Sequence, residues 1–362
     1  MSSHAFFMAR ALQLAERGLY TTTPNPRVGC VIVNDAGHVV GEGWHERAGE
    51  AHAEVHALRT AGEAARGATA YVTLEPCSHF GRTPPCSDAL IAAGVRRVVA
   101  AMQDPNPLVA GRGLARLRDA GIAVEVGVMS EAAARLNEGF ISRVTRGRPW
   151  LRLKLAATLD GKTALNNGQS QWITGEAARA DGHHWRARSC AVLTGIGTVL
   201  ADNPKLNVRS VETLRQPMKI VIDRQLETPI DAAVLDGAPT LIVTAQDDHR
   251  RWVPFEARGV EVIALPNADG RVDLAALMQE LGKRGLNEVL TEAGARLNGA
   301  LVAAGLADAA VIYLAPSFFG DAARGLLALP EMTDLTQRRA VHIDDCSRVG
   351  QDLRLLVRFE RG

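Results

Sequence analysis

The hydrophobic pattern of the first half of the chain predicts strands that alternate with helices. Short runs rich in β-branched residues occur at 28–33, 70–74 and 95–101, and helical patterns begin near Glu50 and Ser87. An amphipathic stripe interrupted by charges precedes them, which favours a helix that packs on a core over a signal peptide or a membrane span. The pattern predicts an α/β layer built on one mixed or parallel sheet.

The same alternation returns after a short cationic stretch at 143–149. Strands are expected at 151–157, 191–194, 219–223, 240–244, 260–265, 288–290 and 309–314, and helices at 176–186, 274–283 and 296–304. The intervening stretch is broken by glycine and proline, as is typical of a domain boundary. A length of 362 residues also favours two cores over one. We therefore expect two α/β domains, residues 1–146 and 147–362.

Charge and cysteine content narrow the class of protein. Lysine and arginine total 41 against 40 acidic residues, so the chain has no general basic field for holding a nucleic acid. The five cysteines are odd in number and sparse, unlike those of a disulfide-stapled secreted domain. We expect a cytoplasmic protein with thiolates available for a metal, and neither nucleic acid nor membrane as a partner.

The strongest chemical signal is His52-Ala53-Glu54, followed by Pro76-Cys77 and later by Cys86. One imidazole and two thiolates leave the fourth position of a tetrahedral zinc ion open, which is typical of catalytic sites. A water there would be acidified, and Glu54 could carry its proton to a leaving nitrogen. The histidine, glutamate and proline-cysteine pattern is the known signature of zinc deaminases. The sequence thus predicts a zinc-dependent hydrolytic deaminase.

Two features leave alternatives open. The generic signature has two residues between its cysteines, whereas eight residues separate Cys77 from Cys86 here. Pro84-Pro85 before Cys86 indicates a helix start, where a thiolate would be favoured. His52 and His56, four residues apart on a helix, form a rival ligand pair. The other alternative is two unrelated core cysteines with surface histidines.

Longer stretches of the sequence resemble one bacterial family, the bifunctional riboflavin-biosynthesis deaminase/reductases. The resemblance rests on motifs spread over nearly the whole chain: Pro24-Asn25-Pro26, residues 49–58, residues 73–86, Asp104-Pro105-Asn106-Pro107, Leu159-Asp160-Gly161-Lys162, residues 170–174, residues 197–202 and Glu292-Ala293-Gly294. The eight-residue spacing between the cysteines is the spacing of this family.

The resemblance implies a fold and two activities. The N-terminal domain would be a cytidine-deaminase-like three-layer domain, and the C-terminal domain would resemble dihydrofolate reductase. The first would hydrolyse the 2-amino group of a phosphoribosylated diaminopyrimidinone, using Zn²⁺. The second would reduce the ribose of the product to a ribityl chain, using NADPH. The family also implies a homo-oligomer, either a dimer or a tetramer.

The resemblance also implies roles for individual residues. His52, Cys77 and Cys86 would be the zinc ligands, and Glu54 the proton carrier. The residues implied to contact NADPH are Ala156, Trp172, Thr198, Asp202, Gly294, Ala295, Arg296, Leu297, Asn298, Gly299 and Ala300. The residues implied to contact the substrate are Asn25, His45, Arg82 and Asn106 in the first domain, and Ser170, Arg186, Leu206, Arg209 and Glu292 in the second.

For residues 147–362, the residues themselves give weaker support for a cofactor site than the motifs of the first domain give for zinc, and alternatives stay open. No Gly-x-Gly-x-x-Gly fingerprint is present, and glycines after strands at 195–198 and 292–296 fit a pyrophosphate site or an ordinary turn. Arg186 and Arg209 suit phosphate clamps. Trp172 fits a core position equally well. Lys154 on a predicted strand would have to pair with a carboxylate such as Glu292, or extend to solvent.

Two other functions compete with the bifunctional enzyme. One is a zinc deaminase of nucleobases or nucleosides with an unrelated C-terminal domain, which the neutral net charge disfavours for RNA. The other is a non-catalytic ligand-binding module with structural zinc, which three ligands disfavour because structural sites usually have four.

Overall fold

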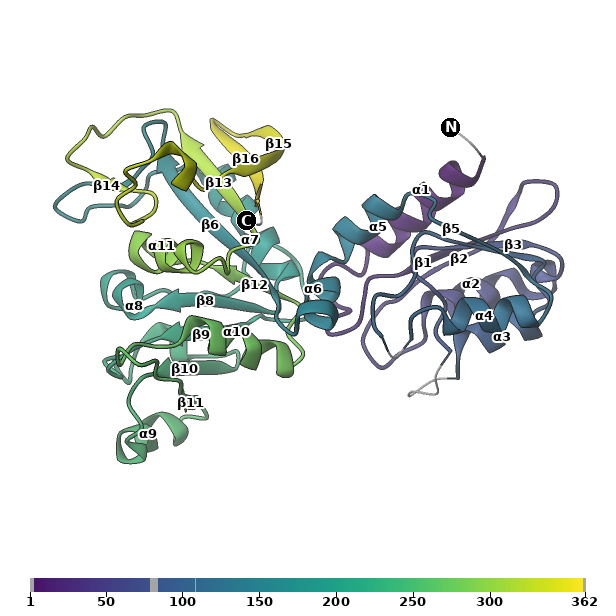
Figure 1. The fold of residues 1–362 in the computed structure, drawn as a ribbon, viewed down its shortest axis with the longest axis horizontal. Helices are drawn as coiled ribbons and strands as arrows, with labels where there is room; N and C mark the ends of the chain where they lie inside the picture. The colour runs from purple at the N-terminus through teal and green to yellow at the C-terminus, as the bar shows by residue number, and fades with distance from the viewer. Residues whose placement is uncertain (1–2, 79–83, 108, 361–362) are drawn as a thin grey trace. The chain divides into compact units, whose positions relative to one another are not determined.

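The chain forms two units, each built on its own sheet, in a computed structural model that describes residues 3–78, 84–107 and 109–360 (Figure 1). The units are Met1–Gly147 and Arg148–Gly362. The last helix of the first unit, α6 (Glu138–Arg146), ends at Gly147, whose φ of 70° is the left-handed conformation that glycine adopts at little cost. The cationic stretch at 143–149 is therefore helical in its first half.

The first unit contains a five-stranded mixed sheet. Its strands are β1 (Gly29–Val33), β2 (Val39–Trp44), β3 (Thr69–Val72), β4 (Arg97–Ala100) and β5 (Ala123–Val126), in the order β2-β1-β3-β4-β5. Strand β1 is antiparallel to both of its neighbours, whereas β3, β4 and β5 are parallel. The sequence pattern predicted β1, β3 and β4 but not the two edge strands, which carry glycines or half-exposed residues in place of an apolar run.

Helices cover both faces of this sheet, which confirms the three-layer prediction. On one face lie α2 (Ala53–Ala61), α3 (Cys86–Ala92) and α4 (Arg112–Asp119), and their apolar side chains share a core with the strands. On the other face lie α1 (Ser3–Glu16) and α5 (Ser130–Leu136), with a second core (Figure 1). A short 3₁₀ helix, Gly62–Ala65, follows α2.

Glycines in β2 fix the height of α2 above the sheet. A Cβ on Gly41 would lie 2.2 Å from the carbonyl oxygen of Ala57, and one on Gly43 would lie 2.5 Å from that of Ala53. Both glycines lie on the same strand face because side chains alternate along a strand. Only glycine permits this close approach, so the N-terminus of α2, with His52 and Glu54, is set by backbone contact.

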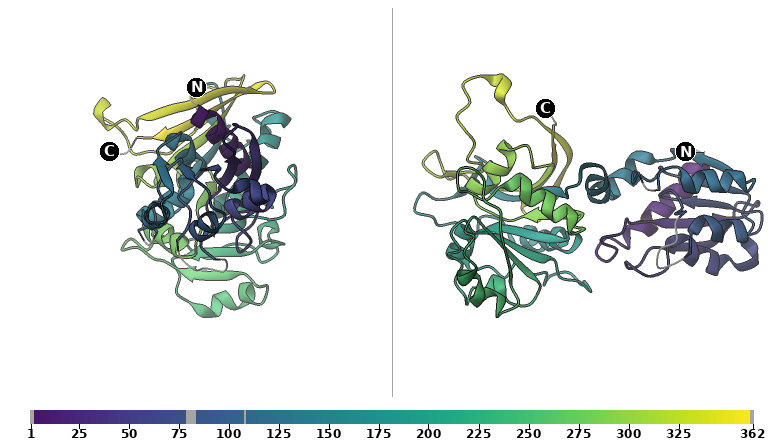
Figure 2. Two further views of the ribbon diagram at one scale, coloured as in Figure 1. Left: turned by 90° about the vertical axis from the view of Figure 1, so that its right-hand side faces the viewer. Right: turned by 60° about the horizontal axis from the view of Figure 1, so that its bottom comes forward.

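The second unit is dominated by a nine-stranded sheet in the order β11-β10-β9-β8-β12-β6-β13-β16-β15. Its strands are β6 (Trp150–Thr158), β8 (Ala191–Gly195), β9 (Met218–Ile222), β10 (Thr240–Thr244), β11 (Glu261–Ala264), β12 (Glu288–Thr291), β13 (Ala309–Ala315), β15 (Val341–Val349) and β16 (Asp352–Phe359). The seven predicted strands form its parallel part. The hairpin of β15 and β16, yellow in Figure 2, adds an antiparallel edge that the pattern did not predict. A separate pair consists of β7 (Lys162–Ala164) and β14 (Arg324–Gly325).

Helices again lie on both faces. The largest core lies under α10 (Leu274–Lys283) and α11 (Ala295–Ala303). The opposite face packs against α7 (Glu176–Arg188), α8 (Ile196–Asp202) and α9 (His249–Glu256). Two 3₁₀ helices, Ala233–Leu235 and Leu335–Gln337, complete the unit.

The strand order reverses at one point of this sheet, where a crevice is expected. From β8 the chain adds β9, β10 and β11 on one side, whereas β12, β6 and β13 lie on the other. In parallel sheets, ligands bind outside the carboxyl ends of the strands where the order reverses in this way. The position between β8 and β12 is therefore where the fold itself favours a cofactor.

Candidate functional site

Three potential metal ligands converge in the first unit. His52 is the N-cap residue of α2, Cys86 is the first residue of α3, and Cys77 lies on the loop between β3 and α3. Their ligand atoms all lie within 4.8 Å of one another. Within the part of the chain that the structure describes, this is the single cluster of three or more such groups.

The spacing of these atoms suits zinc. His52 Nδ1 lies 3.2 Å from Cys86 Sγ and 3.6 Å from Cys77 Sγ. A tetrahedral zinc ion with ordinary bond lengths places nitrogen and sulfur ligands about 3.5 Å apart. One imidazole and two sulfur donors form a set that zinc prefers. The donor set therefore fits a zinc ion with one coordination position left for water.

The two thiols differ in their affinity for a proton. The hydrogen bond from Cys86, together with His52, lowers the pKa of Cys77 to about 4. The same hydrogen bond, together with burial, raises the pKa of Cys86 far above its usual value. Two thiolates this close repel each other unless a cation neutralises them, as zinc would.

The N-terminus of α3 stabilises Cys77, which corrects the sequence-based prediction for Cys86. The backbone N–H of Cys86 donates to Cys77 Sγ at 3.3 Å. The N–H and the hydroxyl of Ser87 both donate to the carbonyl of Cys77, each at 3.1 Å. Helix N-terminal amides favour negative charge, and here they point at the preceding cysteine and not at Cys86 itself.

Glu54 lies beside the three ligand residues in the first turn of α2 and is 3 % exposed. Burial is the main cause that raises the pKa of its carboxyl to about 7, while His52 lowers it. A carboxyl group with a pKa near neutrality can both accept and donate a proton, as a general acid and base must. The arrangement suits the proton carrier that the sequence predicted.

Asn25 and His45 form a polar wall of the same site. His45 is buried and its ring lies edge-on to that of His52, with centroids 5.1 Å apart. His45 Nδ1 lies 3.1 Å from the carbonyl of Ala51, which can only accept, so this nitrogen carries the proton. Its Nε2 then accepts from Asn25 Nδ2 at 3.0 Å. Burial lowers the pKa of His45, which keeps the ring neutral.

The rival ligand His56 does not join the cluster of ligand atoms. It faces β2, because a Cβ on Gly43 would lie 2.6 Å from the Cβ of His56. Two predicted substrate contacts, Arg82 and Asn106, remain. Arg82 lies outside the described residues, and the backbone N–H of Asn106 donates to Asp104 Oδ1 at 2.8 Å in the loop before α4.

Sequence reasoning missed Glu75, which immediately precedes Pro76-Cys77. Its carboxylate is buried and accepts backbone N–H groups from the loop before α4 and from the first turn of that helix. The signal available in the sequence was an acidic residue next to a metal-binding motif at the end of an apolar strand.

In the second unit, the predicted cofactor contacts lie where the fold favours a ligand. Thr198 and Asp202 belong to α8, which begins at the end of β8, and Gly294 caps α11 after β12. Asp202 accepts a hydrogen bond of 2.9 Å from Gln171. Both helices begin directly after these two strands, and backbone amides at helix starts are the donors that a pyrophosphate requires.

Residues 294–300 divide into two groups. Gly294, Arg296 and Ala300 are exposed, and Ala295 and Leu297 are half-buried. Asn298 and Gly299 are buried: Asn298 Nδ2 donates to the carbonyl of Ala293, and a Cβ on Gly299 would lie 2.2 Å from that of Ala328. The last two therefore support the helix from within.

A charged group lies at the end of β12. Arg186 on α7 forms a bidentate ion pair with Glu292. Its Nη2 donates to Oε2 at 2.8 Å, and its Nε donates to Oε1. The remaining nitrogen, Nη1, donates to the carbonyl of Asn207. Burial opposes ionisation, but Arg186 and Lys154 hold the pKa of Glu292 at about 2. Lys154 thus faces a carboxylate as expected, whereas the fork of Arg186 already binds one and is not a free phosphate clamp.

The remaining predicted residues have varied environments. Leu206 is buried with a positive φ of 49°, and its side chain belongs to the core that packs against α9. The backbone N–H of Arg209 donates to His183 Nδ1 at 3.3 Å, while its side chain is exposed. Ser170 and Ala156 are half-buried. Trp172 is 69 % exposed, which excludes the core position considered for it.

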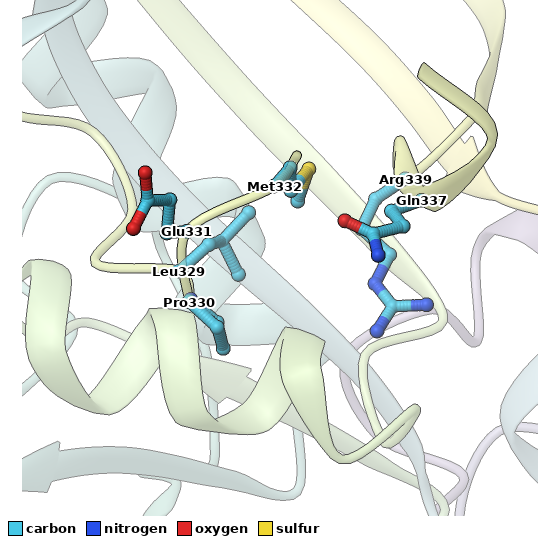
Figure 3. A pocket seen from close by; sticks show the side chains of 6 residues that line it. All are labelled: Leu329, Pro330, Glu331, Met332, Gln337 and Arg339. Carbon is cyan, nitrogen blue, oxygen red and sulfur yellow. The ribbon is translucent and has the colours of Figure 1, made fainter. Parts of the chain in front are cut away.

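A hollow of about 280 Å³ lies elsewhere in the second unit (Figure 3). It is lined by Leu329, Pro330, Glu331, Met332, Gln337 and Arg339, none of which belongs to the predicted sites.

Among the residues described, no helix has the length and apolar character needed to cross a membrane.

Comparison with known proteins gives two family matches. Residues 1–102 match the cytidine and deoxycytidylate deaminase zinc-binding region, and residues 149–353 match the RibD C-terminal domain. The chain is 52 % identical over 361 residues to riboflavin biosynthesis protein RibD of Escherichia coli, which covers 96 % of this chain and 97 % of that protein. It is 47 % identical to the Haemophilus influenzae protein of the same name, over 98 % of this chain and 97 % of that protein.

Solved structures agree with these matches. Acinetobacter baumannii RibD superposes with a TM-score of 0.92 at 44 % identity, and a deaminase/reductase from Thermotoga maritima with 0.87 at 34 % identity. Each comparison covers 99 % of both chains. The chain therefore belongs to the RibD family of bifunctional deaminase/reductases of riboflavin biosynthesis, with a zinc-binding deaminase domain and an NADPH-dependent reductase domain.

Proposed function

We propose that the two activities reside in separate sites, the deaminase around His52, Cys77 and Cys86 and the reductase at the carboxyl ends of β8 and β12. The observation that carries the first assignment is the convergence of one imidazole and two sulfur atoms beside a buried glutamate. The substrate would be a phosphoribosylated diaminopyrimidinone, and the product of the first site would be the substrate of the second.

In the first site, zinc would supply Lewis acidity that lowers the pKa of a water to about 7. The water would lose two protons as its oxygen becomes the ring carbonyl: one would go to the ring nitrogen beside the reacting carbon, and Glu54 would carry one to the amino nitrogen, which leaves as ammonia. Its pKa of about 7 suits both halves of the transfer. Asn25 would contact the pyrimidine through its amide oxygen as an acceptor and the second N–H of its amide as a donor, because only one N–H is donated to His45. Arg82 and Asn106 would hold the sugar phosphate.

In the second site, NADPH would supply a hydride to the ribose of the deaminated pyrimidine. The amides at the starts of α8 and α11, with Thr198 and Asp202, would position the cofactor over the crevice. Glu292 would contact the substrate as a carboxylate, held in place by Arg186. Arg209, whose side chain is exposed, would be the cation available for the substrate phosphate.

One pair of variants tests the two-site assignment in the full-length protein. Cys77→Ser should abolish ammonia release yet still oxidise NADPH when the deaminated pyrimidine is supplied, because zinc is not part of the second site. Glu292→Gln should release ammonia normally and lose NADPH oxidation. Loss of both activities in a folded Cys77→Ser protein would contradict separate sites.

We also propose that the protein is a cytosolic homo-oligomer. Strand β15 is an edge strand of the large sheet, so its outer backbone groups can pair with a strand of another chain, and Val341 and Ile343 on it are exposed. Light scattering coupled to size-exclusion chromatography should give a mass at least twice that of one chain. A monomer at micromolar concentration would contradict the proposal.

A further inference from the structure

The carboxylate of Glu75 organises the loop that follows β4. Oε2 accepts the backbone N–H groups of Asp104 at 3.1 Å and Gly111 at 2.9 Å, and Oε1 accepts those of Gly113 at 2.9 Å and Leu114 at 3.3 Å. The side chain is 4 % exposed. A buried carboxylate is stable when several donors compensate for the lost water, and here each oxygen receives two.

The same glutamate is joined directly to the zinc-ligand segment. Pro76 and Cys77 follow it in the chain, and its backbone N–H donates to the carbonyl of Met102 at 3.0 Å. The start of α4 lies against this segment, because a Cβ on Gly113 would lie 1.9 Å from the carbonyl oxygen of Pro76. The ligand segment and the loop before α4 are therefore fixed to each other by backbone contact and by Glu75.

One further hydrogen bond extends this connection to Asn106. Glu75 Oε2 holds the N–H of Asp104, and Asp104 Oδ1 accepts the N–H of Asn106 at 2.8 Å. The backbone N–H of Asn106 is thus joined to Glu75 by a relay of two carboxylates, while its carbonyl accepts from Val109 and Ala110. Shifts of about 1 Å between groups that bind a substrate can change activity about a hundredfold.

We propose that Glu75 is a positioning residue that sets the distance between the zinc ligands and Asn106, and so selects pyrimidines that carry a ribosyl phosphate. The inference rests on the proposed function, in which Asn106 contacts the sugar phosphate. Glu75 itself touches neither the substrate nor the metal. Its effect should appear in the recognition of the phosphate and not in the chemical step.

The test is steady-state ammonia release by full-length Glu75→Gln, with the phosphoribosylated pyrimidine and with the same compound lacking its phosphate. An amide would turn an NH₂ group toward two N–H donors and release the loop. KM for the phosphorylated compound should rise about tenfold, which equals about 1.4 kcal/mol. KM for the other compound, kcat and zinc content should stay within about threefold of wild type. NADPH oxidation reports that the chain is folded, and Glu63→Gln, at an exposed position of the same unit, is the matched control.

Two more variants distinguish a failure of the Glu75 proposal from a failure of the proposed role of Asn106. Asp104→Ala removes the carboxylate of the second step of the relay and should raise the same KM in the same direction, which keeps the test valid if Glu75→Gln does not fold. Asn106→Ala should raise it too, and combining it with Glu75→Gln should add little further. An unchanged KM in Asn106→Ala would overturn the role of Asn106 in the proposed function. A raised KM in Asn106→Ala with an unchanged KM in the other two, or a loss of zinc in Glu75→Gln, would overturn the relay alone.

Discussion

The zinc site and the reductase site are built in different ways. The zinc ligands come from two short motifs, and two of the three lie at helix starts, at the N-cap of α2 and the first residue of α3. The proposed reductase site combines α7, strands β6 and β12 and the starts of α8 and α11, and Arg186 and Glu292 are 106 residues apart in the chain. The comparison indicates that the metal site depends on a few ligand side chains close together in short motifs. The proposed cofactor site depends instead on backbone amides and charged side chains from many segments of the chain.

The sharpest test of this comparison is Glu54→Gln. Because one carboxyl group is proposed to carry the proton in the zinc site, the amide should lower the deamination rate about 10²–10⁴-fold. Zinc content and NADPH oxidation should be unchanged, since Glu54 is not a ligand. Metal analysis and ammonia release on the same sample check this. Zinc loss in parallel with activity would mean that Glu54 supports the site instead of reacting in it.

The ligand set can be tested with two histidines of one helix. His52→Ala should lower zinc affinity by tenfold or more, about 1.4 kcal/mol, because two thiolates lack a third donor. His56→Ala should leave zinc bound, because His56 faces β2. Competition with a chelator gives the affinities of both variants. Equal losses would favour the histidine pair and refute the trio.

The ion pair of Arg186 and Glu292 should make the stability of the second unit depend on pH in the acid range. Since the pKa of Glu292 is about 2 in the folded protein against a usual 4.5, its stabilisation is complete above pH 4.5 and is lost as the pH falls toward 2. The difference amounts to about 3 kcal/mol. Glu292→Gln should therefore destabilise the second unit at neutral pH and converge with wild type near pH 2.

Denaturant unfolding at several pH values, followed by tryptophan fluorescence, measures this difference. Four of the five tryptophans lie in the second unit, so its unfolding dominates the signal. The exposed Glu212→Gln in the same unit is the control and should show no such dependence. Parallel curves for Glu292→Gln and wild type between pH 7 and pH 3 would refute the role of the ion pair.

The last comparison concerns two helical glycines near the predicted cofactor site. Gly299→Ala should destabilise the second unit by about 1–3 kcal/mol, because its Cβ would meet the carbonyl of Ala328. Gly197→Ala meets nothing within 4 Å and should be neutral or slightly stabilising, by up to about 1 kcal/mol. Thermal unfolding compares the two. Equal stability would mean that α11 can move away from residue 328 at little cost.

Much of the fold was accessible from the sequence. Apolar strands such as β1 and β8 carry their signal in consecutive residues. Motif chemistry favoured the three ligand residues that converge in the structure but left the rival His56 open. The edge strands β2 and β15 and the adjacent β16 were not predicted, because glycines or polar residues interrupt the apolar run. Strands β2 and β15 each pair with the strand next to them in the chain, and β16 also pairs with the more distant β13.

The sequence by itself determined the donor atoms, the two-unit α/β pattern and the likeness to the family, because these depend on residue type and spacing. Only the tertiary structure decided which cysteine the amide of α3 stabilises, that Arg186 is already paired with Glu292, and that Glu75 holds the loop before α4. These facts depend on which groups meet across long stretches of chain. A hydrogen bond is set by position within a few tenths of an ångström, and no local pattern specifies that position.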